Sequence, residues 1–175
     1  MTSYSNPARL KQLFDEEVNL FIKQTGESKK LHEKSAGPMM NGVPMSWMAK
    51  WPGPYPVYVK SAKGAHFSDV DGNDYVDFCL GDTGAMVGHS PDASITAIKN
   101  QLEKGITLML PTEDAAIAAQ TLADRFGVEK WQFTLTATDA NRHIIRYARH
   151  ITGRKKILIH DYCYHGTVDE TFANL

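Results

Sequence analysis

The residues best suited to chemistry lie in the last third of the chain, between residues 131 and 166. Thr136, Ala137 and Thr138 stand between an apolar run and a helical pattern, and their small side chains leave the first amides of the helix accessible. Hydroxyls and free amides at a helix N-terminus bind anions, above all phosphate. The same turn is also typical of an ordinary capped helix start, for which Thr138 is the expected N-cap.

A polar and aromatic cluster at residues 161–166 follows the next apolar run. The apolar runs 131–135 and 157–159 are short enough for buried strands, and a helical pattern at residues 139–152 is closed by Gly153. Strand, turn, helix and strand predict a βαβ unit with a right-handed crossover. Because ligands bind beyond the carboxyl ends of parallel strands, both candidate clusters are expected at one sheet edge.

Several ordered motifs resemble those of one enzyme family. TATDAN, IRYARHITGRKKI and CYHG are similar to the S-G-T-E-A-N, A-I-R-x-A-R-x-x-T-G-R-x-K-I and Y-H-G series of class III pyridoxal-phosphate aminotransferases. FSDVDGNDYVDF and GHSP resemble the D-x-D-G-N-x-Y-x-D-F and G-H-x-x-P series upstream. The likeness runs in consistent order over about residues 53–169, and the group looks like the glutamate-1-semialdehyde aminomutases and the β-amino-acid and amine transaminases.

The resemblance implies an α/β fold, namely the N-terminal part of a three-layer α/β/α PLP-transferase major domain, preceded by a small α+β region. Residues 1–92 are expected to form that region with its dimer contacts, and residues 93–175 the first part of the major domain. The family Ser-Gly-Thr phosphate cup corresponds to Thr136, Ala137 and Thr138, Tyr164 to the residue that stacks on the pyridine ring, and His165 to a pocket residue. The Schiff-base lysine is expected beyond Leu175, so no catalytic residue is expected in this segment.

The implied activity moves an amino group from an amine or amino acid with an apolar group to an oxo-acid acceptor. Trp47, Met48 and Trp51 are the expected substrate-binding residues, because they occupy the loop where the aminomutase has a carboxylate-binding arginine near position 48. No arginine occurs from Leu10 to Ile106. The alternatives are glutamate-1-semialdehyde aminomutase, a truncated non-catalytic relative, and a loop that merely covers the core.

Composition narrows the possible partners. The chain has 175 residues, a net charge of −1 and two cysteines, which gives no electrostatic basis for binding nucleic acid and suits a reduced compartment. No long apolar segment or secretory signal is seen, so no membrane association is expected. With the resemblance, this predicts a cytoplasmic homodimer acting on small molecules.

The remaining patterns predict the upstream elements. Asn6 and Pro7 start a helix that ends near Gly26. The family resemblance implies that this helix packs at the subunit interface. A charged connector at 27–34 and an irregular, Met- and Trp-rich loop at 37–56 follow. Strands are expected at 57–60, 65–68 and 75–78 around an Asp71-Gly72 turn, and helices at 95–102 and 113–126.

Other ligand readings are weaker. A calcium loop from Asp69, Asp71 and Asn73 lacks the glutamate expected at Leu80. A metal site from His160, Asp161 and His165 leaves the rest of the motif unexplained. A dinucleotide site lacks a G-x-G-x-x-G series. His89 has the chemistry of a general base, but a single loop histidine is more often structural.

Overall fold

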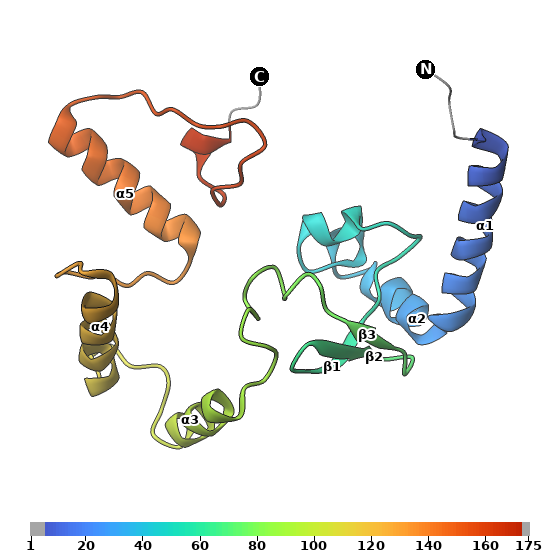
Figure 1. Ribbon diagram of the computed structural model, residues 1–175, viewed down its shortest axis with the longest axis horizontal. Coiled ribbons are helices and arrows are strands. Elements are labelled where there is room, and N and C mark those ends of the chain that lie inside the picture. The colour runs from blue at the N-terminus through green and yellow to red at the C-terminus, as the bar shows by residue number, and fades with distance from the viewer. Residues whose placement is uncertain (1–5, 173–175) are drawn as a thin grey trace. The chain divides into compact units, whose positions relative to one another are not determined.

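The computed structural model describes residues 6–172 and divides into two compact units, Met1–Ile106 and Thr107–Leu175 (Figure 1). Each unit has its own elements and is described by itself. The predicted domain boundary after residue 92 stays a prediction, because a compact unit of this chain need not coincide with a domain of the complete fold. No helix among the described residues is long and apolar enough to cross a membrane.

Two helices open the first unit and meet at a bend (Figure 1). Helix α1 spans Pro7–Gln24, and the Asn6 side chain caps it by accepting from the Arg9 amide at 3.2 Å, as predicted. Helix α2 begins at once and spans Gly26–Ser35. The prediction of a charged connector at 27–34 is therefore wrong. The segment is helical because Asp71, distant in the sequence, caps its N-terminus.

The predicted β-meander is confirmed. Strands β1 (Val59–Lys63), β2 (His66–Asp69) and β3 (Asp74–Val76) form one antiparallel sheet in the order β1-β2-β3. Phe67 and Tyr75 are cross-strand partners whose rings stack with centroids 4.7 Å apart. Such aromatic pairs are typical stabilisers of a small sheet.

Asp69 organises the turn between β2 and β3. Its fully buried carboxylate accepts from the amides of Asp71 and Asn73 at 2.9 and 2.8 Å, and from the Tyr75 hydroxyl at 2.8 Å. Burial disfavours its charge, but these hydrogen bonds outweigh burial and lower the pKa of Asp69. Burial and the bond to Asp69 raise the pKa of Tyr75 to about 12.

Asp71 of the same turn holds α2. Its carboxylate accepts from the amides of Glu27 and Ser28 at 2.5 and 3.0 Å and from the Ser28 hydroxyl at 2.7 Å. These are the free amides at the start of α2, so the hairpin supplies the helix cap. No group of metal-ligating residues is found in the described part of the chain, and the turn carboxylates are used by protein donors.

The loop at 37–56 is irregular, as predicted, with two 3-10 turns, η1 at Met40–Gly42 and η2 at Ser46–Lys50. Tyr55 anchors it, because its buried hydroxyl lies 3.1 Å from the Thr25 hydroxyl and its ring lies 5.1 Å from that of Phe21. Helix α3 (Asp92–Leu102) ends the regular structure of the first unit.

The described part of the second unit, up to residue 172, holds two helices and a short 3-10 turn: α4 (Glu113–Phe126), α5 (Ala137–Thr152) and η3 (Asp169–Thr171). Both helices end on a left-handed glycine, Gly127 and Gly153, at the predicted positions.

The predicted buried strands at 131–135 and 157–159 are not formed in the described structure. Leu135 is 98% exposed and Leu158 is 91% exposed, so these apolar runs lack cover. A strand exists only through hydrogen bonds to a neighbouring strand, and the described residues supply none to either segment.

Candidate functional site

The N-terminus of α5 has a different cap from the one predicted. Thr136 adopts an extended conformation, and its hydroxyl accepts from the Asp139 amide at 3.1 Å while donating to the Asp139 carboxylate at 2.9 Å. Thr138, the predicted N-cap, already lies in the first helical turn. A capping oxygen must come from the residue just before the helix, so the position of the first helical residue decides between the two threonines.

Thr138 instead joins the turn to the second motif. Its hydroxyl oxygen accepts from the Thr167 amide at 3.2 Å, and the neighbouring Asn141 side chain donates to the His165 carbonyl at 2.8 Å. A methyl group added at Gly166 would lie 2.3 Å from the Thr138 hydroxyl oxygen. The structure therefore brings the two clusters predicted from the sequence into direct contact.

Tyr164 is 79% exposed, and His165 is half-buried beside the same turn. Sequence reasoning did not single out Asn141 or Thr167, although Asn141 closes the TATDAN motif and was available as a signal. Asn141 donates to the His165 carbonyl, and the Thr167 amide donates to the Thr138 hydroxyl. Together these contacts fix the course of the Tyr-His-Gly segment over the helix end.

The donors that remain at this turn fit a phosphate group. The amides of Ala137 and Thr138 precede the first intrahelical hydrogen bond, and Thr136 uses only the next amide, that of Asp139. The Thr138 hydroxyl accepts one bond and keeps its proton to donate. Two amides, one hydroxyl and the positive end of a helix dipole favour an anion at this place.

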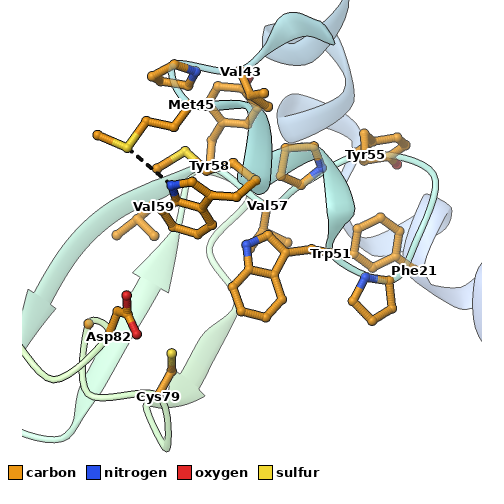
Figure 2. Close-up of a pocket in the computed structure, with 16 residues that line it drawn as sticks. Phe21, Val43, Met45, Trp51, Tyr55, Val57, Tyr58, Val59, Cys79 and Asp82 are labelled. Atoms are coloured by element: carbon orange, nitrogen blue, oxygen red, sulfur yellow. Dashed lines mark hydrogen bonds between the residues drawn. The ribbon is translucent and has the colours of Figure 1, made fainter. Parts of the chain in front are cut away.

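A large apolar cavity of about 1080 Å³ lies in the first unit (Figure 2). Trp47, Met48 and Trp51 all line it, so the structure groups the three predicted substrate-binding residues around one space. The two indole rings meet edge to face at 6.1 Å. The other lining residues are Phe21, Val43, Pro44, Met45, Pro52, Tyr55, Pro56, Val57, Tyr58, Val59, Cys79, Gly81 and Asp82.

The polar edge of this cavity comes from the loop after β3, which carries Cys79, Gly81 and Asp82 (Figure 2). Sequence reasoning singled out neither Cys79 nor Asp82. No motif pointed to them, since their importance depends on a cavity built by residues some thirty positions earlier in the chain.

Asp77 and His89 hold that loop. The Asp77 carboxylate accepts from the amides of Cys79, Leu80 and Gly81 at 2.8, 2.9 and 3.1 Å, and lies 2.6 Å from His89 Nε2. The hydrogen bond with His89 is the main cause that lowers the pKa of Asp77, and the three amides add to it. The contacts described for His89 are thus structural, and its backbone also pairs with Gly64.

The sequence of this chain is similar to those of known proteins. The aminotransferase class-III family profile matches residues 47–174. Glutamate-1-semialdehyde 2,1-aminomutase of Methanocaldococcus jannaschii is 40% identical over 146 residues, which cover 82% of this chain and 33% of that protein.

Two crystal structures share the fold. A variant glutamate-1-semialdehyde aminomutase of Pseudomonas aeruginosa in complex with PMP is 44% identical, with a TM-score of 0.90 over 95% of this chain and 37% of that one. A β-phenylalanine aminotransferase of Variovorax paradoxus is 28% identical, with a TM-score of 0.83 over 89% of this chain and 36% of that one. These matches confirm the predicted PLP-transferase fold. The chain spans about a third of the length of the curated relatives it matches.

Proposed function

Because this chain belongs to the aminotransferase class-III family, which depends on pyridoxal phosphate, we propose that the complete protein is an aminotransferase for donors with an apolar group. The donor is an amine or amino acid, and an oxo acid accepts the amino group. The observation that carries this proposal is the apolar cavity around Trp47, Met48 and Trp51.

The chemistry of the cavity walls favours such a donor over one that carries a carboxylate in place of the apolar group. Aromatic and thioether side chains stabilise an apolar substituent by removing it from water. A carboxylate leaves water only when a cation or several hydrogen-bond donors replace its hydration. The segment from Leu10 to Ile106 contains no arginine, and Asp82 gives the cavity a negative edge instead.

The second unit supplies the residues for the cofactor in this proposal. The amides of Ala137 and Thr138 and the hydroxyl of Thr138 bind the phosphate, while Thr136 keeps the helix end in shape. Tyr164 stacks on the pyridine ring, and His165 lines the site. Pyridoxal phosphate, when bound, supplies the electron sink for the carbanion formed beside the substrate nitrogen.

Glutamate-1-semialdehyde aminomutase is the second candidate, favoured by the 40% identity to the Methanocaldococcus jannaschii enzyme of that name. Steady-state rates of the complete protein with an aromatic amine, a β-amino acid and glutamate semialdehyde separate the two. We expect higher kcat/KM for the apolar donors and a loss of aromatic-amine activity in Trp47→Ala. Preference for the semialdehyde, with the aromatic-amine rate unchanged in Trp47→Ala, would contradict the proposal.

The cofactor assignment has a separate test. Thr138→Ala removes one phosphate donor and the contact to Thr167, so we expect about a tenfold rise in the Kd of pyridoxal phosphate, as for loss of one hydrogen bond to a charged group. Tyr164→Ala is expected to weaken binding as well. Thr121→Ala, at an exposed position inside α4, is the matched control. Parent-like Kd values in both site variants would show that the cofactor lies elsewhere.

A non-catalytic relative is the remaining alternative. Absorbance spectra of the complete purified protein, with and without added pyridoxal phosphate, address it directly. A cofactor band that survives gel filtration and disappears on reduction with borohydride is expected of an enzyme of this family. A protein that binds no pyridoxal phosphate under these conditions is not an aminotransferase.

A further inference from the structure

Asp82 is the one charged side chain among the described residues that line the apolar cavity. We propose that it selects amino donors that carry a second cationic group, remote from the amine that reacts, on an apolar spacer. The inference rests on the proposed function, because it assumes that the cavity receives the donor. It makes Asp82 a specificity-determining residue with a named ligand class, alkyl or aryl diamines.

The position of Asp82 supports a ligand contact. Figure 2 shows Asp82 and Cys79 on one side of the cavity and Val43 and Met45 on the opposite side. Among the described residues, the Asp82 carboxylate makes no hydrogen bond or ion pair, whereas Asp77 close by is fully engaged. A carboxylate that the fold does not use is available to a ligand.

The backbone of the loop is held in an unusual conformation that fixes where Asp82 lies. Leu80, Asp82 and Thr83 have positive φ values of 56°, 55° and 70°. Residues other than glycine rarely adopt positive φ values. The strain of such a conformation persists only when surrounding contacts impose it. Asp77 supplies these contacts, because its carboxylate accepts hydrogen bonds from three loop amides and lies within hydrogen-bond distance of His89.

Electrostatics then determines the ligand. A substrate that fills the cavity displaces water from the apolar walls of the cavity and from the Asp82 carboxylate. Removing water from an ionised carboxylate that gains no partner costs free energy. An ammonium group on the substrate removes the cost by pairing with Asp82, and the faces of Trp47 and Trp51 also attract a cation. Since the reacting amine must be uncharged to act as a nucleophile, the ammonium group that pairs with Asp82 is a second one.

The experiment compares hexane-diamine with heptylamine, which has nearly the same length but a methyl group in place of the second amine. Values of kcat/KM are measured for the complete protein and for Asp82→Asn, Asp82→Glu and Glu103→Gln. Asparagine suits position 82 because it tolerates positive φ and removes only the charge. Glu103, an exposed carboxylate outside the cavity, is the matched control.

We expect the parent to prefer the diamine, and the diamine-to-monoamine ratio to fall about fivefold in Asp82→Asn, the upper range for a solvent-accessible ion pair. Asp82→Glu keeps the charge and should retain most of the preference, and Glu103→Gln should behave as the parent. An unchanged ratio in Asp82→Asn overturns the inference while leaving the aminotransferase function intact.

A binding measurement separates the inference from turnover. Benzyltrimethylammonium carries a fixed cation and cannot be a donor. Its binding is followed by the change in tryptophan fluorescence, to which Trp47 and Trp51 at the cavity contribute. We expect Asp82→Asn to raise its Kd about fivefold. If neither amine is a donor but this shift is seen, the proposed function fails and the cation site stands. An equal Kd in parent and variant defeats the cation site.

Discussion

A single close contact at the residue scale links the two motifs of the proposed cofactor region. Gly166 has a φ of +81° and packs directly against Thr138, where an added Cβ would lie 2.3 Å from the hydroxyl oxygen and 2.9 Å from Cα. Only glycine satisfies both the backbone conformation and the approach. The motif glycine therefore brings the Tyr-His-Gly segment onto the helix end.

Gly166→Ala should displace this segment from the helix end. We expect the Kd of pyridoxal phosphate to rise by tenfold or more, because the strain and the clash together cost on the order of 1–3 kcal/mol. Gly153→Ala is the matched control, since Gly153 also has a positive φ of 68° but nothing lies within 4 Å of its added Cβ. Equal effects of the two substitutions on cofactor binding would rule out the contact as the cause.

At the scale of the elements, the β-hairpin and helix α2 depend on each other. Asp71 reaches 43 residues back along the chain to the amide of Ser28, and the polar helix α2 has no cap from its own N-cap residue, Thr25. Tertiary packing rather than helix propensity therefore explains why this charged segment is helical. Burial opposes the charge of Asp71, but the Ser28 and Glu27 donors outweigh it and lower the pKa of Asp71.

Asp71→Ala should lower the free energy of unfolding by about 1 kcal/mol at neutral pH, the usual cost of losing an N-cap. The pKa of Asp71 is lowered from 3.8 in the folded state, so its contribution is complete above pH 3.8 and lost as pH falls through the folded pKa. The stability difference between parent and variant should thus shrink in acid. Urea unfolding of the complete protein against pH measures it. Glu129→Ala is the control, because Glu129 is exposed and makes no hydrogen bond or ion pair among the described residues.

At the scale of the whole molecule, the homodimer remains a proposal, supported by the apolar stripe of α1. None of the α1 residues is buried, and Phe14 is 62% exposed on the same stripe as Leu10 and Leu13. Apolar side chains gathered on one face of a helix are typical of an interface. The interface role was expected from the family resemblance and is consistent with this exposure.

Phe14→Asp should weaken the dimer, because it places an uncompensated charge in a desolvated contact. Sedimentation of the complete protein over a range of concentrations should show a dissociation constant at least about tenfold higher than that of the parent. Gln12→Asp adds the same charge on the opposite face of α1 and should leave the dimer unchanged. A parent-like dimer in Phe14→Asp would place the subunit contact elsewhere.

The sequence by itself determined the features that depend on neighbouring residues. Asn6 and Pro7 start α1, Gly127 and Gly153 end α4 and α5, and the Asp71-Gly72 turn lies in the meander, because caps and tight turns involve groups only a few positions apart. The order of the motifs also identified the family, which the comparisons confirm.

Only the tertiary structure decided the features that depend on distant partners. Helix α2 exists because Asp71 caps it, and the apolar runs at 131–135 and 157–159 remain unpaired because a strand requires a neighbour that local sequence cannot supply. Thr136, not Thr138, is the N-cap of α5, because the helix begins at Ala137, one residue before Thr138. Asp82 gains its place at the cavity in the same way, since the cavity walls come from residues far apart in the chain and a carboxylate acquires its role from what surrounds it.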